Sequence, residues 1–197
     1  MTTPTIFDER DAGGFRGRFR HEMKQSWSVD LAVKRLRLSA IDLDRELEGI
    51  HSVRLVLARV RAAALDAEAH VLMARPEARA RLTLFLRLME EGRMRIRVAP
   101  LGGWSPDFTV FTDARGPRSV LMGFHQFERV YPHPGPALGA CFGRRGALMA
   151  RARFEEIWGR SYDILPAIHT ILARARRWAD GPGPEGYSPV DTLRALG

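Results

Sequence analysis

Two kinds of hydrophobic pattern alternate along the chain. Compact apolar runs bounded by polar or turn-forming residues predict strands over residues 27–33, 52–60, 95–100, 108–112 and 119–124. Amphipathic stretches and stretches rich in Ala, Leu, Arg and Glu predict helices over residues 15–25, 36–47, 61–91, 148–159 and 166–179. Because a proline disfavours helical backbone at the residue before it, Pro76 predicts that the longest stretch forms two helices. Three prolines predict an irregular segment over residues 128–143.

The order of these elements predicts the fold class and the domain organisation. Strands that alternate with helices are typical of an α/β domain, here a single domain with a mixed central sheet flanked by helices. The turn-rich connection between the strands at 95–100 and 108–112 favours a hairpin. We expect a flexible arm over residues 1–14, the domain over 15–180 and a C-terminal tail over 181–197.

Composition restricts the class of protein. The chain has 197 residues, 45% of them apolar, which suits one ordinary domain with its own core. No apolar run reaches the roughly 18 residues needed to cross a bilayer, and the polar N-terminus lacks the apolar region of a secretory signal. Cys141 is the only cysteine, which excludes an internal disulfide and a multi-cysteine metal site. We therefore expect a cytoplasmic protein without a membrane span.

Charge suggests a class of partner. Lys and Arg number 31 against 23 acidic residues, for a net charge of +8. Lys24 and Lys34 are the only lysines, so arginine supplies nearly all of the positive charge. Guanidinium groups bind phosphate bidentately, and a net positive field attracts polyanions, so nucleic acid is a candidate partner. A coding bias toward arginine is the alternative explanation.

Three segments between residues 84 and 158 read LMEEGRMRIRVAPLGGWSPDFTVF, SVLMGF and ARFEEIW. This order resembles one half of the phospholipase D superfamily. In that family a helix ends at a glycine and a strand leads to an H-x-K motif; a strand ending in vGSxN and a helix carrying F..lW follow. Upstream, SWSVDLAV and SVRLVLARV resemble its opening strands. The resemblance spans residues 15–175 and implies a phospholipase D-like half. It also implies a homodimer, because such halves pair across a twofold axis.

The motif that carries the chemistry of that family departs from its pattern here. The resemblance places Ser105 where the family has its nucleophilic His, and Asp107 where it has its Lys. In the family the His attacks phosphorus and the Lys stabilises the phosphoryl oxygens. A serine without a general base is a poor nucleophile, and an aspartate repels phosphate. The sequence therefore predicts a catalytically degenerate member.

The segment after the last predicted strand offers a replacement for the missing groups. His125, Glu128 and His133 could form a rebuilt acid–base site for a phosphodiesterase or nuclease. The plainer interpretation is that these side chains hydrogen-bond loop backbone. The two histidines are eight residues apart without a metal-binding motif, and no glycine-rich cofactor motif precedes a helix, so we predict neither a metal nor a cofactor.

A second set of residues is predicted to contact phosphate. Arginines at the start of a helix oppose its dipole, so those near residue 144 are better explained by an anionic ligand than by the helix itself. The predicted phosphate-contacting residues are Ser105, Gln126, Arg129, Arg144, Arg145 and Arg151. Three functions stay open: a degenerate phospholipase D-like protein that binds nucleic acid or another phosphate-bearing ligand, a rebuilt phosphodiesterase or nuclease, and a non-enzymatic dimerisation or ligand-sensing module.

Overall fold

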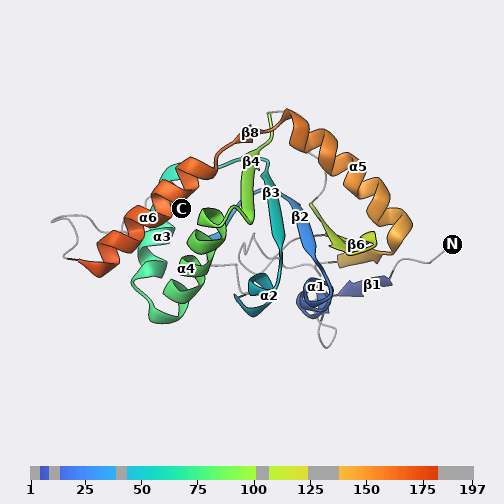
Figure 1. Ribbon diagram of the computed structural model, residues 1–197, viewed down its shortest axis with the longest axis horizontal. Helices are drawn as coiled ribbons and strands as arrows, with labels where there is room; N and C mark the ends of the chain where they lie inside the picture. Colours follow the sequence, from blue (N-terminus) through green and yellow to red (C-terminus); the bar gives the residue numbers. More distant parts are fainter. Residues whose placement is uncertain (1–4, 9–13, 39–43, 101–106, 124–137, 182–197) are drawn as a thin grey trace.

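The computed structural model describes residues 5–8, 14–38, 44–100, 107–123 and 138–181. Within these residues one mixed sheet contains eight strands in the order β1-β7-β6-β5-β2-β3-β4-β8 (Figure 1). The strands are β1 (Thr5–Asp8), β2 (Ser28–Val33), β3 (Ser52–Leu57), β4 (Met94–Val98), β5 (Phe108–Asp113), β6 (Gly116–Gly123), β7 (Leu138–Phe142) and β8 (Tyr162–Asp163). β2, β3 and β4 are parallel, and all other pairings are antiparallel. The predicted α/β class with a mixed central sheet is confirmed.

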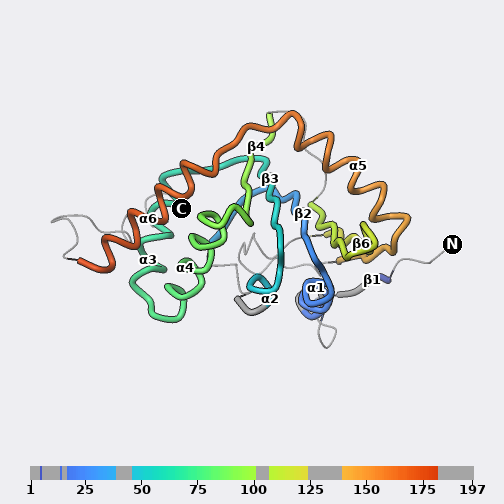
Figure 2. Tube along the Cα trace, viewed as in Figure 1, coloured from blue at the N-terminus to red at the C-terminus, as the bar shows by residue number. Residues whose placement is uncertain are grey.

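Helices cover both faces of this sheet. They are α1 (Gly14–Lys24), α2 (Asp44–Glu48), α3 (Ala62–Met73), α4 (Pro76–Glu90), α5 (Arg144–Arg160) and α6 (Leu165–Asp180). Side chains of α1, α2, α3, α4 and α6 form the larger core on one face, and α5 packs on the other face. The Cα trace shows α5 continuing through β8 into α6 past the end of β4 (Figure 2). None of the described helices is long and apolar enough to cross a membrane.

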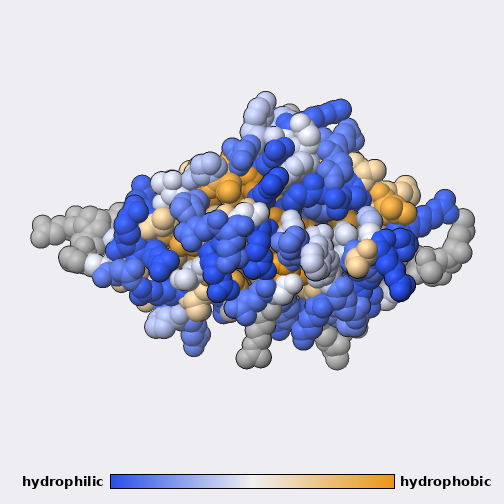
Figure 3. Space-filling model, in the orientation of Figure 1, coloured by the Kyte–Doolittle hydropathy of each residue, from blue (hydrophilic) through white to orange (hydrophobic). Residues whose placement is uncertain are grey.

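The alternation of side chains explains the two cores. In β2, Val29, Leu31 and Val33 point into the larger core, whereas Ala32 joins the smaller cluster under α5. Because β2 and its neighbour β3 are covered on both faces, their sequences read as nearly continuous apolar runs. The surface in Figure 3 is mostly hydrophilic, with hydrophobic areas scattered between charged side chains.

Several predicted elements are confirmed. The break at Pro76 separates α3 from α4, and α1 begins one residue before its predicted start. The predicted helix over residues 36–47 is shorter in its described part, because residues 34–37 are not helical and α2 begins at Asp44. Residues 39–43 lie outside the described part of the chain.

The predicted hairpin between the strands at 95–100 and 108–112 is wrong. β4 pairs with β3 and β8, whereas β5 pairs with β2 and β6. The most apolar strands, β2 and β3, take the centre of the sheet and separate β4 from β5. The hairpin forms instead between β5 and β6, where Gly116 adopts a φ of +103°.

Three short strands were not predicted. β1 lies within the predicted arm, β7 lies within the segment predicted to be irregular, and β8 precedes α6. β1 pairs with β7, so residues more than a hundred positions apart stabilise each other. The pairing partner of such a strand cannot be inferred from a local pattern of four or five residues. The predicted tail over 181–197 lies outside the described residues apart from Gly181.

Candidate functional site

The carboxyl ends of the three parallel strands define the candidate site. β2, β3 and β4 end at the same edge of the sheet, which we call the carboxyl edge. β5 begins there, because Phe108 lies opposite Ala32, and β6 ends there, because Met122 lies opposite Phe108. Ligands of open α/β sheets bind at such an edge, where strand order changes direction.

Two positions singled out by the resemblance meet at this edge. The backbone N–H of Gly123 donates to the carbonyl oxygen of Asp107 at 3.3 Å. The resemblance places Asp107 at the position of the family's Lys, and this residue is only 8% exposed. It places Gly123 at the Gly of vGSxN, and Gly123 has a φ of +137°, a conformation that favours glycine. A backbone hydrogen bond therefore joins the start of β5 to the end of β6 at these two positions.

Exposed cations accompany this carboxyl group along the edge. The N–H of Arg59 donates to the carbonyl oxygen of Lys34 at 3.2 Å, so the residues that follow β2 and β3 are neighbours. Lys34, Arg59 and Arg61 are exposed. None of the three forms an ion pair with another described residue. Their positive charge is therefore available to an anion.

Most of the predicted site residues lie outside the part of the chain that the structure describes. These are Ser105, His125, Gln126, Glu128, Arg129 and His133. Among the described residues, no group of three or more His, Cys, Asp or Glu side chains is arranged to hold a metal ion.

The structure describes the three predicted arginines of α5, and they lie away from the carboxyl edge. β7 runs antiparallel to β6, so the helix that follows it begins at the opposite edge of the sheet. There Arg144 Nη2 donates to the carbonyl oxygen of Arg115 at 2.6 Å, and Arg145 is exposed. Arg151 Nη1 donates to Asp30 Oδ2 at 2.6 Å, so its guanidinium is occupied by contacts within the protein. The structure does not bring these three arginines together with Asp107.

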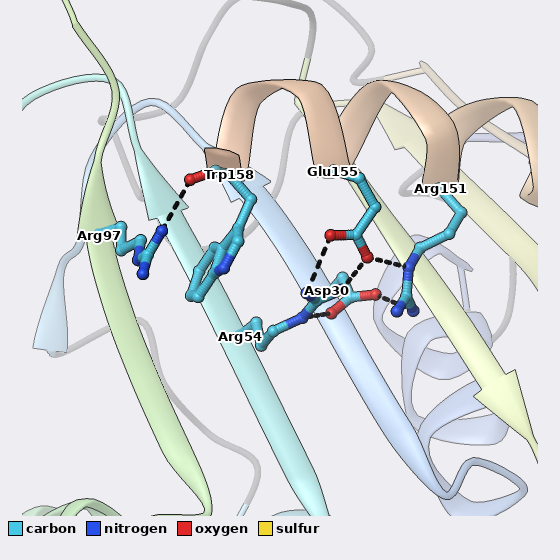
Figure 4. A network of polar contacts seen from close by, with 6 residues as sticks. All are labelled: Asp30, Arg54, Arg97, Arg151, Glu155 and Trp158. Atoms are coloured by element: carbon cyan, nitrogen blue, oxygen red, sulfur yellow. Dashed lines mark hydrogen bonds and ion pairs between the residues drawn. The ribbon is translucent and has the colours of Figure 1, made fainter. Parts of the chain in front are cut away.

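A buried network that the sequence analysis missed joins α5 to the sheet (Figure 4). Asp30, only 2% exposed, lies in the middle of β2. Arg54 Nε on β3 donates to its Oδ1 at 2.6 Å, and Arg151 binds its Oδ2. Glu155 accepts from Arg54 Nη2 and from Arg151 Nε, both at 2.7 Å. The signal in the sequence was a lone carboxylate inside the apolar run SVDLAV, because a buried charge requires partners.

This network is electrostatically self-contained. Burial opposes the charge on Arg54, but hydrogen bonds to Glu155 and Asp30 outweigh it and raise the pKa of Arg54 above its ordinary value. The hydrogen bond from Arg54 lowers the pKa of Glu155, burial opposes that shift, and Arg151 adds to it. Two carboxylates thus neutralise two guanidinium groups. The arrangement fixes α5 on the sheet.

Aromatic rings of α5 complete the contact. The guanidinium carbon of Arg54 lies 4.9 Å from the ring centroid of Phe154 and 5.2 Å from that of Trp158. Arg97 on β4 lies 4.5 Å from the Trp158 ring and donates through Nη1 to the Trp158 carbonyl oxygen at 2.9 Å. The residues of the family's F..lW helix motif therefore pack against arginines of the sheet.

Comparisons with known proteins identify solved structures with a similar architecture. No family model matches the chain, and no curated protein matches it. Among solved structures, Nuc from Salmonella typhimurium, a phospholipase D family member, matches with a TM-score of 0.52 and 11% identity over 82% of this chain and 97% of Nuc. NucT from Helicobacter pylori has a TM-score of 0.47 and 12% identity, covering 82% of this chain and 99% of NucT.

TrmBL2, an archaeal chromatin protein whose structure shows a novel mode of DNA binding, has a TM-score of 0.49 and 9% identity. That match covers 83% of this chain and 55% of TrmBL2. The match to Nuc and the sheet described above agree with the resemblance found in the sequence. The chain therefore has a phospholipase D-like fold.

Proposed function

We propose that this protein binds a phosphate-bearing polyanion, nucleic acid, at the carboxyl edge of its sheet and does not perform phosphodiester hydrolysis there. The observation that carries the proposal is the buried residue Asp107, whose backbone pairs with Gly123 at the carboxyl edge. A family member needs an ammonium at that position to stabilise the phosphoryl oxygens, and a carboxylate there opposes the transition-state charge. Loss of hydrolysis does not require loss of binding.

Binding is supported by exposed cations at the same edge of the sheet. Lys34 and Arg59 are exposed neighbours at the ends of β2 and β3, and neither is neutralised by another described residue. The net charge of +8 attracts a polyanion over a longer distance. Nucleic acid meets these requirements because its backbone presents regularly spaced phosphates.

The binding test uses charge reversal at the carboxyl edge. The double variant Lys34→Glu/Arg59→Glu should weaken binding of a labelled oligonucleotide about tenfold or more, and should flatten the dependence of log K on log salt by about 1.5 to 2. The matched control is Arg176→Glu/Arg177→Glu on the exposed surface of α6, which changes net charge equally. Equal losses in both double variants would show that net charge, rather than this edge, governs binding.

The catalytic test uses an activated phosphodiester and labelled DNA and RNA. We expect no hydrolysis above that of a buffer blank. Hydrolysis that disappears in His125→Ala would establish the rebuilt phosphodiesterase instead. Absence of both binding and hydrolysis would leave the dimerisation or ligand-sensing module. Light scattering tests the homodimer that the resemblance implies.

A further inference from the structure

The geometry points to a second phosphate-binding site, formed by Arg95 and Arg97 on the face of β4 next to α5. This inference goes beyond the proposed function, because Arg95 lies within β4 and both arginines project from a face of the sheet. Met94 and Ile96 of the same strand point into the larger core, so the alternation of side chains turns Arg95 and Arg97 to the α5 side. α5 packs mainly over β2, β5, β6 and β7, and it leaves Arg95 exposed.

Neither Arg95 nor Arg97 forms an ion pair with a described residue; Asp163, opposite Arg97 in the β4–β8 register, accepts from the backbone N–H of Leu165. Arg95 lies directly opposite Arg54 in the β3–β4 register, at the spacing of neighbouring strands. Arg54 is already neutralised, because Asp30 and Glu155 balance Arg54 and Arg151. Arg95 therefore adds a positive charge that the Asp30 and Glu155 carboxylates do not balance.

Arg97 adds a second charge on the same side of the strand. No described carboxylate forms an ion pair with either Arg95 or Arg97. Nη1 of Arg97 is bound to the Trp158 carbonyl oxygen, and its guanidinium lies against the indole ring, so the group is held in place before a ligand arrives (Figure 4). The Nε and Nη2 atoms of Arg97 form no hydrogen bond with described residues.

The spacing of the two arginines fits one phosphate group. Residues i and i+2 of a strand are about 6.6 Å apart and point to the same side. Two guanidinium groups at that spacing can converge on the oxygens of a single phosphate, each through paired N–H donors. The ligand class is therefore a phosphate group, either free or within a nucleic-acid backbone, and it would neutralise the charges of Arg95 and Arg97.

The test measures thermal stabilisation by inorganic phosphate, by tripolyphosphate and by a short oligonucleotide. It is carried out in the Lys34→Glu/Arg59→Glu background, so that the carboxyl edge does not contribute. Three further substitutions are made in this background: Arg95→Gln, Arg95→Glu and the control Arg176→Glu. None of them removes a residue of the Asp30 network. The rise in Tm with ligand should be lost in both Arg95 variants and kept in the control.

The two Arg95 variants separate ligand binding from folding. Without phosphate, both Arg95 variants should unfold at nearly the Tm of the parent, because the Arg95 side chain is exposed and forms no ion pair with a described residue. The apparent Kd for phosphate should rise about tenfold or more in both variants. An unchanged ligand-induced rise in Tm in both, or no rise in the parent with any ligand, would overturn the inference.

The three ligands identify the source of the phosphate. A response to all of them supports a general phosphate site, and a response confined to the oligonucleotide supports a site for the nucleic-acid backbone. Failure of the edge variants to weaken nucleic-acid binding would contradict the proposed function alone. The titration of the Arg95 variants with phosphate would still test the second site independently.

Discussion

Asp30 on one face of the sheet and Glu22 on the other are both buried carboxylates paired with arginine, but they hold different elements together. On the α5 face, Asp30 lies at the centre of a strand, and its partners come from β3 and α5. On the other face, Glu22 of α1 is 1% exposed; its carboxylate forms an ion pair with Arg118 Nη2 at 2.7 Å and accepts from the Ser119 hydroxyl. Asp30 thus fixes α5 on the sheet, and Glu22 fixes the end of α1 against β6.

The difference follows from the hydrophobic core on each face. Five helices share the extensive core of the Glu22 face, so burial of apolar side chains already holds them in place. Among the described helices, α5 alone contributes to the smaller cluster on the Asp30 face. Charged contacts therefore carry a larger share of the docking of α5. The comparison teaches that the face with the smaller apolar core is also the face on which Arg95 is exposed.

The largest expected effect is that of removing the charge on Asp30. Asp30→Asn leaves Arg54 and Arg151 with Glu155 as their remaining carboxylate, and should lower the free energy of unfolding by about 3 to 5 kcal/mol. Urea denaturation measures it. The control is Asp180→Asn, which breaks an exposed pair with Arg79 and should cost less than about 1 kcal/mol.

Glu22→Gln is the matched variant on the opposite face. The amide keeps an oxygen acceptor for the hydroxyl of Ser119, and the large core around α1 remains, so we expect a loss of about 1 to 3 kcal/mol. A larger loss for Glu22→Gln than for Asp30→Asn would contradict the view that the Asp30 face depends more on charge.

Two glycines of α5 test how closely that helix approaches the sheet. A Cβ on Gly146 would lie 2.6 Å from the Cβ of Phe142, whereas a Cβ on Gly159 would meet nothing within 4 Å. Gly146→Ala should therefore destabilise the protein by about 1 to 3 kcal/mol. Gly159→Ala should stabilise it by up to about 1 kcal/mol through helix propensity. Thermal unfolding of both variants would refute a closely docked α5 if they shifted Tm in the same direction.

The smallest expected effect is a pH dependence from Glu155. Its pKa in the folded protein lies below the value of about 4.3 for an unfolded chain. The folded state therefore binds fewer protons, so Glu155 stabilises the fold fully above that value, and the stabilisation is lost as pH falls through the folded pKa. Unfolding free energies measured between pH 3 and 6 should depend less on pH in Glu155→Gln. An identical profile in wild type and variant would argue against the pairing with Arg54.

Sequence patterns predicted the helices and the central strands because those elements are long or strongly apolar. The proline at position 76 marked a helix boundary by local sterics alone. The pairing of the strands was harder to predict from the sequence. β4 and β5 are close in sequence but are separated by two buried strands, and β1 and β7 depend on a partner more than a hundred residues away.

The candidate site could be predicted in part. The resemblance pointed to positions 107 and 123, and a backbone hydrogen bond joins these two residues, whereas their roles stay predictions. The role of Arg151 was not accessible, because its partner Asp30 lies 121 residues earlier. A basic residue at the start of a helix looks the same in sequence whether it binds phosphate or a buried carboxylate.

The outermost strands of the sheet have a consequence for solubility. β1 has four residues and β8 has two, so the margins of an otherwise broad sheet offer few free backbone hydrogen-bonding groups. Long, flat margins template the addition of further chains, and very short terminal strands are one way in which natural proteins prevent it. Deleting residues 5–8 would uncover the longer β7, and such a truncated protein should self-associate more readily at high concentration.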